Sequence, residues 1–455
     1  MRGVSSYVAV ATLLAVVVAT SLVILVVTVN YSGIIKGEEA VLKNVVVIED
    51  VYRGDPVLKL LVLRVRNVGS VPAVIDEALI STGGSVVKVG IGPYVVRADS
   101  EALIAVPTNL SDYEVFSIKV CGRGVESSVV TGLRLADLPT LMVMKWSKVV
   151  ITERSGESLR NYVVNVTLTP SWSGWGYVLP NGSDIFFADS RGNPLYFWIE
   201  RFDYGSRVGT IWVKVPYIPA NSNVTIYMFY GYSRTLGRNP YGSYMNPYRT
   251  FIFFDSFEGR FEWVNWSLGI VYRINSLSHD GTYSLEKDVY CDPNGGYREL
   301  GKVLTGSFAL EAWVMRLSKT PCWWDRVGVV DDSMNGYGIG VGVYAIPSAT
   351  LGGVGPYVFI DKRTNSYGTI IASIDSVPGL GQGIWYFDRF IRLSNGTLIA
   401  EVYLSNGTKV AEVRTVDTTY TTFTRVYVFG GYPYVVDTIR IRPYTTPEPL
   451  VKVIS

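Results

Sequence analysis

The sequence has few of the side chains from which most catalytic and metal centres are built. Among 455 residues there is a single histidine, His279, and there are three cysteines, Cys121, Cys291 and Cys322. One histidine argues against a metal centre built on several histidines and against a Ser-His-Asp triad. Three cysteines are too few for a disulfide scaffold.

Charge is also scarce and evenly spread. Charged residues make up 18% of the chain and the net charge is +2, with no long basic or acidic run. This distribution does not indicate a nucleic-acid partner. No P-loop, CxxC pair or G-x-S-x-G motif occurs, and the glycines of GYGIGVG (336–342) fit a glycine-rich turn between strands better than a phosphate loop. Asp184, Asp189 and Glu200 could be read as a carboxylate pair for hydrolysis, but turn and strand-end positions are the favoured interpretation. With no catalytic motif present, we do not expect an enzyme.

What the chain has in quantity favours strands. It is rich in Val, Ile, Thr, Tyr and Trp, and it holds 45 glycines and 21 prolines. This composition is typical of short strands joined by tight turns. We predict a mainly β protein, with one N-terminal helix followed by three β-sandwich domains.

The N-terminal stretch is apolar. After Arg2 the next charged residue is Lys36, and residues 7–29 are apolar apart from Ser and Thr. As a helix these residues span about 35 Å, enough to cross a bilayer core of about 30 Å. Arg2 orients the N-terminus to the cytoplasm, which predicts a cell-membrane or cell-surface protein with the bulk of the chain outside. A secretory signal peptide is the alternative, but its apolar core is shorter and ends in a cleavage site.

Small residues line one face of this predicted helix. Ala11, Ala15 and Ala19 recur every fourth residue, a spacing that lets helices approach closely within a membrane. We therefore expect this face to be a helix-packing surface.

The first residues carry a family resemblance. Arg2-Gly3 followed by VSSYV and the apolar run resembles the class III signal and N-terminal helix of archaeal type IV pilins. The resemblance implies cleavage by a prepilin peptidase between Gly3 and Val4. It also implies that the helix anchors the subunit before assembly and then packs against other pilin subunits. Val8 stands where bacterial pilins carry a glutamate.

The next segment predicts a small β-sandwich. In LKLLVLRVRNVGSVPAVIDEALI, Leu61, Leu63 and Val65 alternate with arginines, and Asn67-Val68-Gly69 forms a turn. A sandwich behind a pilin helix resembles the globular head of archaeal pilins. Cys121 ends a strand and is expected to be a buried or free thiol.

A second resemblance covers nearly 90 residues. DIFFADSRGNPLYFWIE (184–200) and IWVKVPYIPANSNVTIYMFYG (211–231) are very similar to the signature of an uncharacterised extracellular β-sandwich family that often precedes a lectin-like jelly roll. Alternation of Ile211, Val213 and Val215 with Trp212 and Lys214 predicts a half-buried strand. Two prolines, at positions 216 and 219, are expected to end it.

The remainder resembles a concanavalin A-like jelly roll of the laminin-G and carbohydrate-binding-module kind. FFDSFEG, SHDGTYSLEK, FALEAWVMRL and YPYVVDTIRIRPY carry this resemblance in that order. The predicted boundaries along the whole chain are a leader over 1–3, a helix over 4–35, a pilin-like sandwich over 36–140, a second sandwich over 141–235, a linker over 236–250 and the jelly roll over 251–447.

The jelly-roll resemblance implies a structural Ca²⁺. Its ligands would be Asp255, Glu258, Asp280 and Asp437, since Ca²⁺ takes six to eight oxygen ligands. The alternative is that these carboxylates cap turns and strand ends. No other cofactor is expected.

Aromatic and modification sites complete the prediction. Trp172, Trp175, Trp323 and Trp324 are candidates for a glycan platform, with core packing as the alternative. Cys291 and Cys322 could form a disulfide, and oxidised and reduced states both stay open. Asn-X-Ser/Thr sequons indicate a glycosylated exterior; besides Asn30, they lie at Asn109, Asn165, Asn181, Asn223, Asn265, Asn395 and Asn406.

Together these features predict a membrane-inserted, type IV pilin-like surface protein of an archaeon. We expect a minor or adhesive pilus subunit that displays lectin-like domains, with surface glycans as the candidate partner. A major subunit with outward-facing domains stays open. The alternative is a permanently anchored carbohydrate-binding receptor that does not polymerise. A secreted polysaccharide-active enzyme is the least favoured hypothesis.

Overall fold

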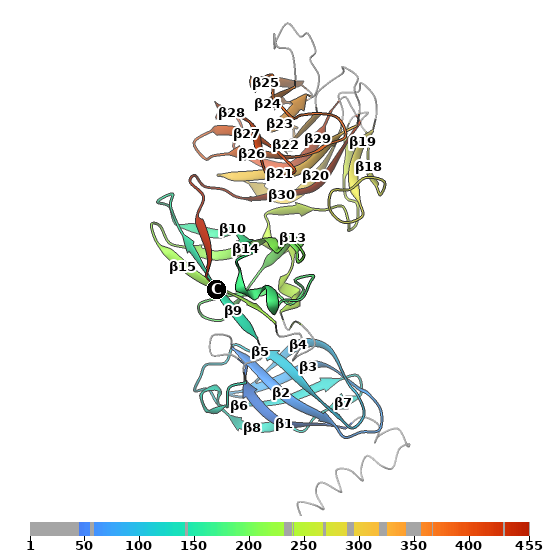
Figure 1. The fold of residues 1–455 in the computed structure, drawn as a ribbon, viewed down its shortest axis with the longest axis vertical. Coiled ribbons are helices and arrows are strands. Elements are labelled where there is room, and N and C mark those ends of the chain that lie inside the picture. Colours follow the sequence, from blue (N-terminus) through green and yellow to red (C-terminus); the bar gives the residue numbers. More distant parts are fainter. Residues whose placement is uncertain are drawn as a thin grey trace, which may run out of the picture. The chain divides into compact units, whose positions relative to one another are not determined.

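The computed structural model describes residues 45–54, 59–141, 144–231, 239, 241–266, 270–288, 295–317, 325–342, 356–365, 367–430 and 433–454. In this part of the chain nearly all regular structure is strand, drawn as arrows in Figure 1, which confirms the mainly β prediction. None of the described helices is long and apolar enough to cross a bilayer, and the predicted helix over 4–35 lies outside the described residues. The short helical turns are η1 (Leu135–Asp137), η2 (Ser173–Gly176), η3 (Gly242–Tyr244) and α3 (Pro247–Thr250).

The chain divides into two compact units. The first comprises Met1–Lys145, Arg191–Asn193 and Gly231–Tyr241. The second comprises Trp146–Ser190, Pro194–Tyr230 and Gly242–Ser455, so the second and third predicted sandwiches share one unit.

The first unit contains a sandwich of antiparallel strands. One sheet runs in the order β1-β2-β5 and the other in the order β4-β3-β6-β7, with β8 beside β6. Leu61, Leu63 and Val65 are fully buried in the core between them, as their alternation predicts. Asn67 is buried and its side chain accepts a hydrogen bond from the backbone N–H of Gly69, which forms the expected turn. The strands are β1 (Val46–Arg53), β2 (Leu60–Asn67), β3 (Ala73–Thr82), β4 (Ser85–Val96), β5 (Ser100–Pro107), β6 (Phe116–Gly122), β7 (Val125–Glu126) and β8 (Val130–Leu133).

The second unit begins with what we call the middle sandwich, residues 146–190 and 194–230 together with 450–454. Its sheets run β10-β14-β13 and β12-β11-β15-β9-β31. The strands are β9 (Lys145–Thr152), β10 (Leu159–Leu168), β11 (Phe186–Asp189), β12 (Pro194–Leu195), β13 (Phe197–Asp203), β14 (Val208–Ile218), β15 (Asn223–Tyr230) and β31 (Leu450–Ile454).

The last strand of the chain returns to this sandwich. β31 pairs antiparallel with β9, from Leu450 opposite Thr152 to Ile454 opposite Lys148. In Figure 1 this red strand ends at the label C, beside β9. The domain that precedes it is therefore inserted between β15 and β31, an arrangement that the sequence analysis, which left residues after 447 unassigned, did not anticipate.

Pro216 does not end its strand, contrary to expectation. β14 continues to Ile218, and Tyr217 still pairs with Arg160 of β10. On its other side β14 pairs with β13 only as far as Val213, so at Pro216 that side of β14 is an edge where no partner requires its missing N–H.

The inserted domain, here called the C-terminal sandwich (251–443), has a front and a back sheet. The front sheet runs β18-β19-β30-β21-β26-β27-β28 with β16 beside β30, and the back sheet runs β17-β20-β29-β22-β23-β24-β25. Front strands are β16 (Phe253–Asp255), β18 (Ile270–Ile274), β19 (Ser284–Asp288), β21 (Phe308–Arg316), β26 (Trp385–Arg392), β27 (Thr397–Leu404), β28 (Lys409–Val416) and β30 (Tyr434–Pro443). Back strands are β17 (Val264–Trp266), β20 (Gly295–Leu304), β22 (Asp325–Val330), β23 (Gly336–Gly342), β24 (Tyr357–Thr364), β25 (Tyr367–Ile374) and β29 (Phe423–Phe429).

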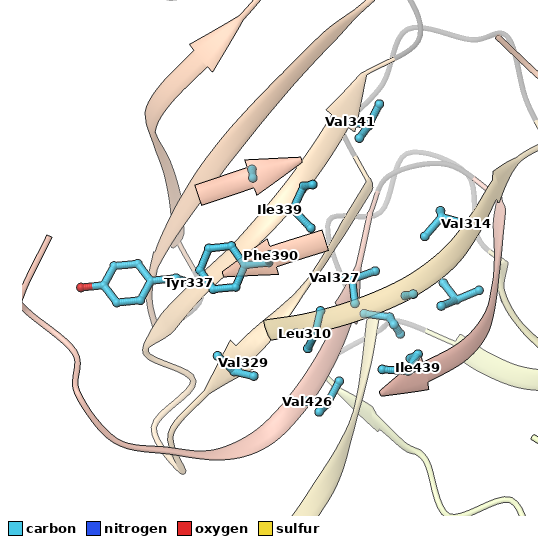
Figure 2. Packing of buried hydrophobic residues seen from close by; sticks show 14 of the residues in the cluster. Leu310, Val314, Val327, Val329, Tyr337, Ile339, Val341, Phe390, Val426 and Ile439 are labelled. Atoms are coloured by element: carbon cyan, nitrogen blue, oxygen red, sulfur yellow. The ribbon is translucent and has the colours of Figure 1, made fainter. Parts of the chain in front are cut away.

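Its core lies between these sheets. Figure 2 shows Leu310 and Val314 of β21 packed with Val327 of β22 and Val426 of β29. Because successive side chains of a strand point to opposite faces, the burial of Leu310 and Val314 places Glu311 and Trp313 on the outer face of the front sheet.

Residues 336–342 form a buried strand rather than a turn. β23 pairs with β22 and β24, and all of its residues are buried. A Cβ at Gly340 would lie 2.1 Å from the Phe359 ring, and one at Gly338 would lie 2.5 Å from the Tyr427 hydroxyl. Glycine is needed here for the close approach of aromatic side chains.

Candidate functional site

A cleft lies between the middle and C-terminal sandwiches of the second unit. Its volume of about 600 Å³ falls within the range of about 300–1,000 Å³ usual for ligand pockets. One wall is a face of β10, β14 and β13, and the other is the outer face of the front sheet. The lining residues are Asn165, Glu200, Arg201, Thr210 and Trp212 from the first wall, and His279, Asp280, Glu311, Trp313, Phe387, Arg389, Tyr403, Leu404, Ser405, Gly407 and Arg440 from the second.

Aromatic side chains form a row across the front sheet. Trp313 of β21 is the register partner of Phe387 of β26, which in turn is the partner of Tyr403 of β27. The ring centroids are 5.2 Å apart for the first pair and 6.1 Å for the second. Cross-strand partners share a face, so the three rings present one continuous apolar surface to the cleft. We call it the aromatic row.

The single histidine extends this row. The His279 ring stacks on Trp313 with centroids 3.8 Å apart and an interplanar angle of 12°, and it meets Trp385 edge-on. Trp313 is half-buried, and its indole Nε1 has no hydrogen-bond partner among the described residues. The nitrogen atom is itself buried, and a buried donor without a partner is costly.

Beside the aromatic row lies a row of alternating charges. Glu311 is the register partner of both Arg440 and Arg389, and Arg389 is the partner of Glu401. Arg440 donates from Nε to Glu311 at 2.6 Å, and Arg442 donates to the same carboxylate at 3.0 Å. Burial would raise the pKa of Glu311, but the guanidiniums of Arg442, Arg440 and Arg389 lower it to about 2. Glu311 is therefore ionised at neutral pH.

The opposite wall is joined to this charged row by one arginine. Arg440 Nη1 donates to Glu200 at 2.5 Å, and its guanidinium lies 4.6 Å from the Trp212 ring centroid. Trp212 Nε1 also donates to Glu200, at 2.7 Å. Asn165 is the register partner of Trp212 and shares its face of the sheet. Glu200, which the sequence analysis placed at a strand end, is thus part of the cleft.

A second arginine and the last strand further hold the two walls. Arg442 donates to Glu448 at 2.6 and 3.1 Å, and the Glu448 backbone carbonyl accepts from Arg154 at 2.6 and 3.0 Å. Tyr162 donates to the Glu448 carboxylate at 3.3 Å. Because β31 follows directly and pairs with β9, the cleft is bounded by covalent, ionic and sheet connections.

Two of the four carboxylates predicted to bind Ca²⁺, Glu258 and Asp437, accept hydrogen bonds from one loop. Glu258 accepts from the backbone N–H of Thr282 and Tyr283, and Asp437 accepts from those of His279 and Asp280. Among the described residues no group of three or more acidic, histidine or cysteine side chains is placed to hold a metal. Backbone N–H groups therefore use oxygens of Glu258 and Asp437.

Asp255 is the clearest departure from the calcium prediction. It is buried and forms an ion pair with Arg298, while Trp263 Nε1 donates to it at 2.8 Å and the Phe257 N–H at 2.9 Å. The Arg298 guanidinium already neutralises this carboxylate, so Asp255 does not fit the role of a calcium ligand.

Trp172 and Trp175 are packing residues, which corrects their assignment to an exposed glycan platform. They are 5% and 3% exposed and meet edge-on at 5.1 Å. Trp172 Nε1 donates to Ser147, and Trp175 Nε1 donates to the Thr169 carbonyl. The η2 turn folds both rings into the sandwich, because SWSGWG supplies glycine where the Trp172 ring lies 2.0 Å from a would-be Cβ of Gly174.

Several predicted residues lie outside the described part of the chain. They are Gly3, Val4, Ala11, Ala15, Ala19, Cys291, Cys322, Trp323 and Trp324. Cys121 is described; it is half-buried and free, and burial raises the pKa of its thiol. Of the described sequons, Asn165 is half-buried in the cleft wall, whereas Asn109, Asn181, Asn223, Asn265, Asn395 and Asn406 are exposed.

The aromatic row was not predicted from the sequence, although the strand pattern contains an indication of it. Strand pattern alone places Trp313 with Glu311, and Phe387 with Arg389, opposite the core-facing residues. Large rings alternating with charges on an outward face mark a covered or ligand-binding surface. What cannot be read from one sequence is that three such strands are neighbours in register.

Comparison with known proteins gives one family match. The model of a domain of unknown function, DUF2341, matches residues 181–269, a segment that includes both parts of the signature given above for an uncharacterised β-sandwich family. The chain is also 37% identical over 199 residues to the uncharacterised protein MJ1394 of Methanocaldococcus jannaschii. That alignment covers 43% of this chain and only 19% of the length of the relative.

Solved structures similar to the chain come from several groups. An endo-β-1,4-glucuronan lyase from Trichoderma reesei is 12% identical with a TM-score of 0.31, over 43% of this chain and 97% of that chain. The exoplasmic domain of VIP36, in a form bound to Ca²⁺ and Man3GlcNAc, is 11% identical with a TM-score of 0.31, over 42% and 92%. The carbohydrate-binding module CBM66 of Bacillus subtilis is 11% identical with a TM-score of 0.28, over 40% and 95%.

Proposed function

We propose that the chain binds a saccharide in the cleft between its middle and C-terminal sandwiches. The observation that carries this proposal is the aromatic row beside a row of fixed charges in a cleft of about 600 Å³. A sugar ring has apolar C–H faces and a polar hydroxyl rim, so it needs flat aromatic surfaces together with directional polar groups. The two rows offer both on adjacent lines of one sheet.

Individual residues have distinct roles in this proposal. Trp313 and Phe387 provide the platform for a sugar face. Arg389, held by Glu401 and by a 2.6 Å hydrogen bond to the Tyr403 hydroxyl, provides further donors. On the opposite wall the Asn165 amide and the Thr210 hydroxyl face the same space.

The glutamates of the cleft do not fit the acid of a glycosidase. That acid is a carboxyl group that can give up a proton near neutral pH. Glu311 has its pKa lowered to about 2, mainly by Arg442 and Arg440 against the effect of burial, and so it cannot act as that acid. Glu200 accepts hydrogen bonds from both Arg440 and Trp212, which fix its position.

Saccharide binding is tested with the full chain on a glycan array, followed by calorimetry of any ligand found. Trp313→Ala is expected to weaken binding by at least about tenfold, because buried aromatic contacts each contribute about 2 kcal/mol or more. Trp146→Ala is the control, since Trp146 is 39% exposed and does not line the cleft. Equal binding by both variants would overturn the proposal.

We further propose that the apolar run over 7–29 anchors the chain in a membrane with its sandwiches outside. The lack of charge between Arg2 and Lys36 supports this placement, and the Arg2-Gly3 leader supports a pilin-like subunit. A fixed, non-polymerising anchor is the alternative. N-terminal sequencing separates them: a mature chain that starts at Val4 supports the pilin-like subunit, whereas one that starts at Met1 contradicts it.

A further inference from the structure

A pentapeptide occurs twice in the C-terminal sandwich. Leu-Ser-Asn-Gly-Thr forms residues 393–397 and again residues 404–408, and both copies contain a sequon. The first copy joins β26 to β27, and the second joins β27 to β28. The two copies therefore lie at opposite ends of the single strand β27.

The two turns have the same hydrogen bonds. In the first, the Thr397 N–H donates to Asn395 Oδ1 at 3.0 Å and the Gly396 N–H to the Leu393 carbonyl at 2.9 Å. In the second, the Thr408 N–H donates to Asn406 Oδ1 at 2.9 Å and the Gly407 N–H to the Leu404 carbonyl at 2.9 Å. Both asparagines are exposed, and no described residue bonds to either Nδ2. Locally, the two sequons are equivalent acceptors.

Their surroundings differ. Leu404, Ser405 and Gly407 line the cleft, so the second turn is part of its rim. The first turn contributes none of the lining residues; it contacts Ser307 instead, whose hydroxyl accepts from the Ser394 N–H at 2.9 Å. Asn406 is three residues beyond Tyr403 of the aromatic row, about 10 Å along an extended chain.

We propose that an N-linked glycan on Asn406 occupies the cleft and caps the aromatic row of its own chain. This inference rests on the proposed saccharide binding and on exposure of the chain to a glycosylating machinery. In the modification, Asn406 Nδ2 forms a bond to C1 of a lipid-phosphate-linked oligosaccharide. The C1–O bond breaks, the lipid phosphate leaves with that electron pair, and one amide proton passes to base. The attached sugars then lie at the cleft rim, next to Tyr403.

Capping by a tethered sugar regulates the site. A tethered ligand acts at an effective concentration of the order of millimolar, so for a free glycan with a dissociation constant of about 0.1 mM it weakens apparent binding by about tenfold. The same glycan on Asn395, at the far end of β27, cannot reach the row and leaves binding unchanged. The chain thus contains its own matched control.

The experiment uses the full chain produced in a glycosylating host, with Asn406→Gln and Asn395→Gln compared with wild type. Mass spectrometry of peptides first establishes that Asn406 carries a glycan, and an unmodified Asn406 would overturn the inference. Hydroxyl-radical footprinting then measures oxidation of Trp313 and Phe387. We expect oxidation to rise at least about twofold in Asn406→Gln alone, because the cap is lost; equal oxidation in both variants would overturn the inference.

A binding measurement separates this inference from the function on which it rests. The probe is the oligosaccharide released from the wild-type chain by an amide-cleaving glycosidase. It is expected to bind Asn406→Gln about tenfold more tightly than wild type or Asn395→Gln. If it binds all three chains equally and each through Trp313, only the capping is wrong. If Trp313→Ala in the Asn406→Gln background does not weaken binding, saccharide binding by the aromatic row is wrong as well.

Discussion

Two groups of charged side chains are buried in the second unit, and they differ in how many cations each carboxylate meets. In the outer cluster, which joins the sandwiches, Glu311 contacts both Arg440 and Arg442 at 2.6 and 2.9 Å. In the inner cluster, between the front and back sheets, Asp325 and Asp388 share Arg316 at 2.8 and 3.9 Å. All of these side chains are almost fully buried.

The difference shows in their protonation. Burial raises the pKa of every carboxyl group, but the Arg442 and Arg440 charges overcome this for Glu311 and lower its pKa to about 2. For Asp325 and Asp388 burial prevails over Arg316, and their pKa values rise from 3.8 to about 7. Lys287 and Arg326 also act on Asp325 without reversing the shift. The guanidiniums around Glu311 thus keep its buried charge, whereas burial prevails where Asp325 and Asp388 share Arg316.

The largest expected effect is on the outer cluster. Arg440→Ala leaves Glu311 and Glu200 without their common cation, and breaking a buried ion pair costs about 3–5 kcal/mol. Denaturant unfolding measures this loss. Arg414→Ala is the control, because its pair with Glu412 is exposed and is expected to cost less than about 1 kcal/mol. Equal losses in the two variants would contradict the comparison.

The second prediction concerns the inner cluster. Because the native pKa values of Asp325 and Asp388 lie near 7 and the unfolded values near 3.8, the native chain binds more protons than the unfolded chain within this range. The contribution of these groups to the free energy of unfolding therefore falls as the pH rises from about 4 to about 7. Asp388→Asn removes one of the groups and is expected to flatten the decline, measured as melting temperature against pH.

In the same experiment Glu311 is expected to give stability the opposite dependence on pH. Its native pKa of about 2 lies below its ordinary value of 4.5, so its contribution to stability is present above pH 4.5 and is lost as the pH falls toward 2. In the Asp388→Asn chain, the loss of melting temperature below pH 4.5 should be unchanged. If this variant changed the melting temperature equally below pH 4.5 and between pH 4 and 7, the clusters would not be independent.

The smallest expected effect is that of removing the hydroxyl of Tyr403, which belongs to the aromatic row and bonds to the charged row beside it. Tyr403→Phe keeps the ring but removes the hydroxyl that accepts from Arg389 at 2.6 Å and donates to Glu401 at 2.9 Å. We expect a loss of about 1 kcal/mol in the free energy of unfolding, the usual net value of a hydrogen bond. Saccharide affinity should change less than in Trp313→Ala. A larger loss in Tyr403→Phe would place the site in the hydroxyl rather than in the rings.

Local pattern was sufficient for much of the fold. The alternation through Leu61, Leu63 and Val65 and the turn at Asn67 follow from strand geometry and side-chain chemistry, and both are found. Where a strand is buried on both faces the pattern weakens. The glycines of β23 looked like a turn because their role, to admit Phe359 and Tyr427, depends on strands distant in sequence.

The candidate site was less accessible to sequence. Asp437 was predicted from the sequence as a calcium ligand. Only the structure shows that its carboxylate accepts hydrogen bonds from the backbone N–H groups of His279 and Asp280. Trp172 and Trp175 were predicted as a glycan platform because they lie close together in the sequence, but their rings are buried. Trp313 has no second tryptophan near it in the sequence and was not predicted. The row depends on the register between β21, β26 and β27, and the sequence of any one of these strands does not predict that register.

The pairing of β31 with β9 has a consequence for biosynthesis. During translation β9 leaves the ribosome long before β31, because the whole inserted domain lies between them in the sequence. Until then one edge of β9 lacks its neighbour, while the whole inserted domain is made and can fold on its own. A nascent chain that stops early would keep that edge exposed, ready to pair with other chains or to be recognised by a chaperone. Closure of the middle sandwich therefore waits until the inserted domain has been synthesised.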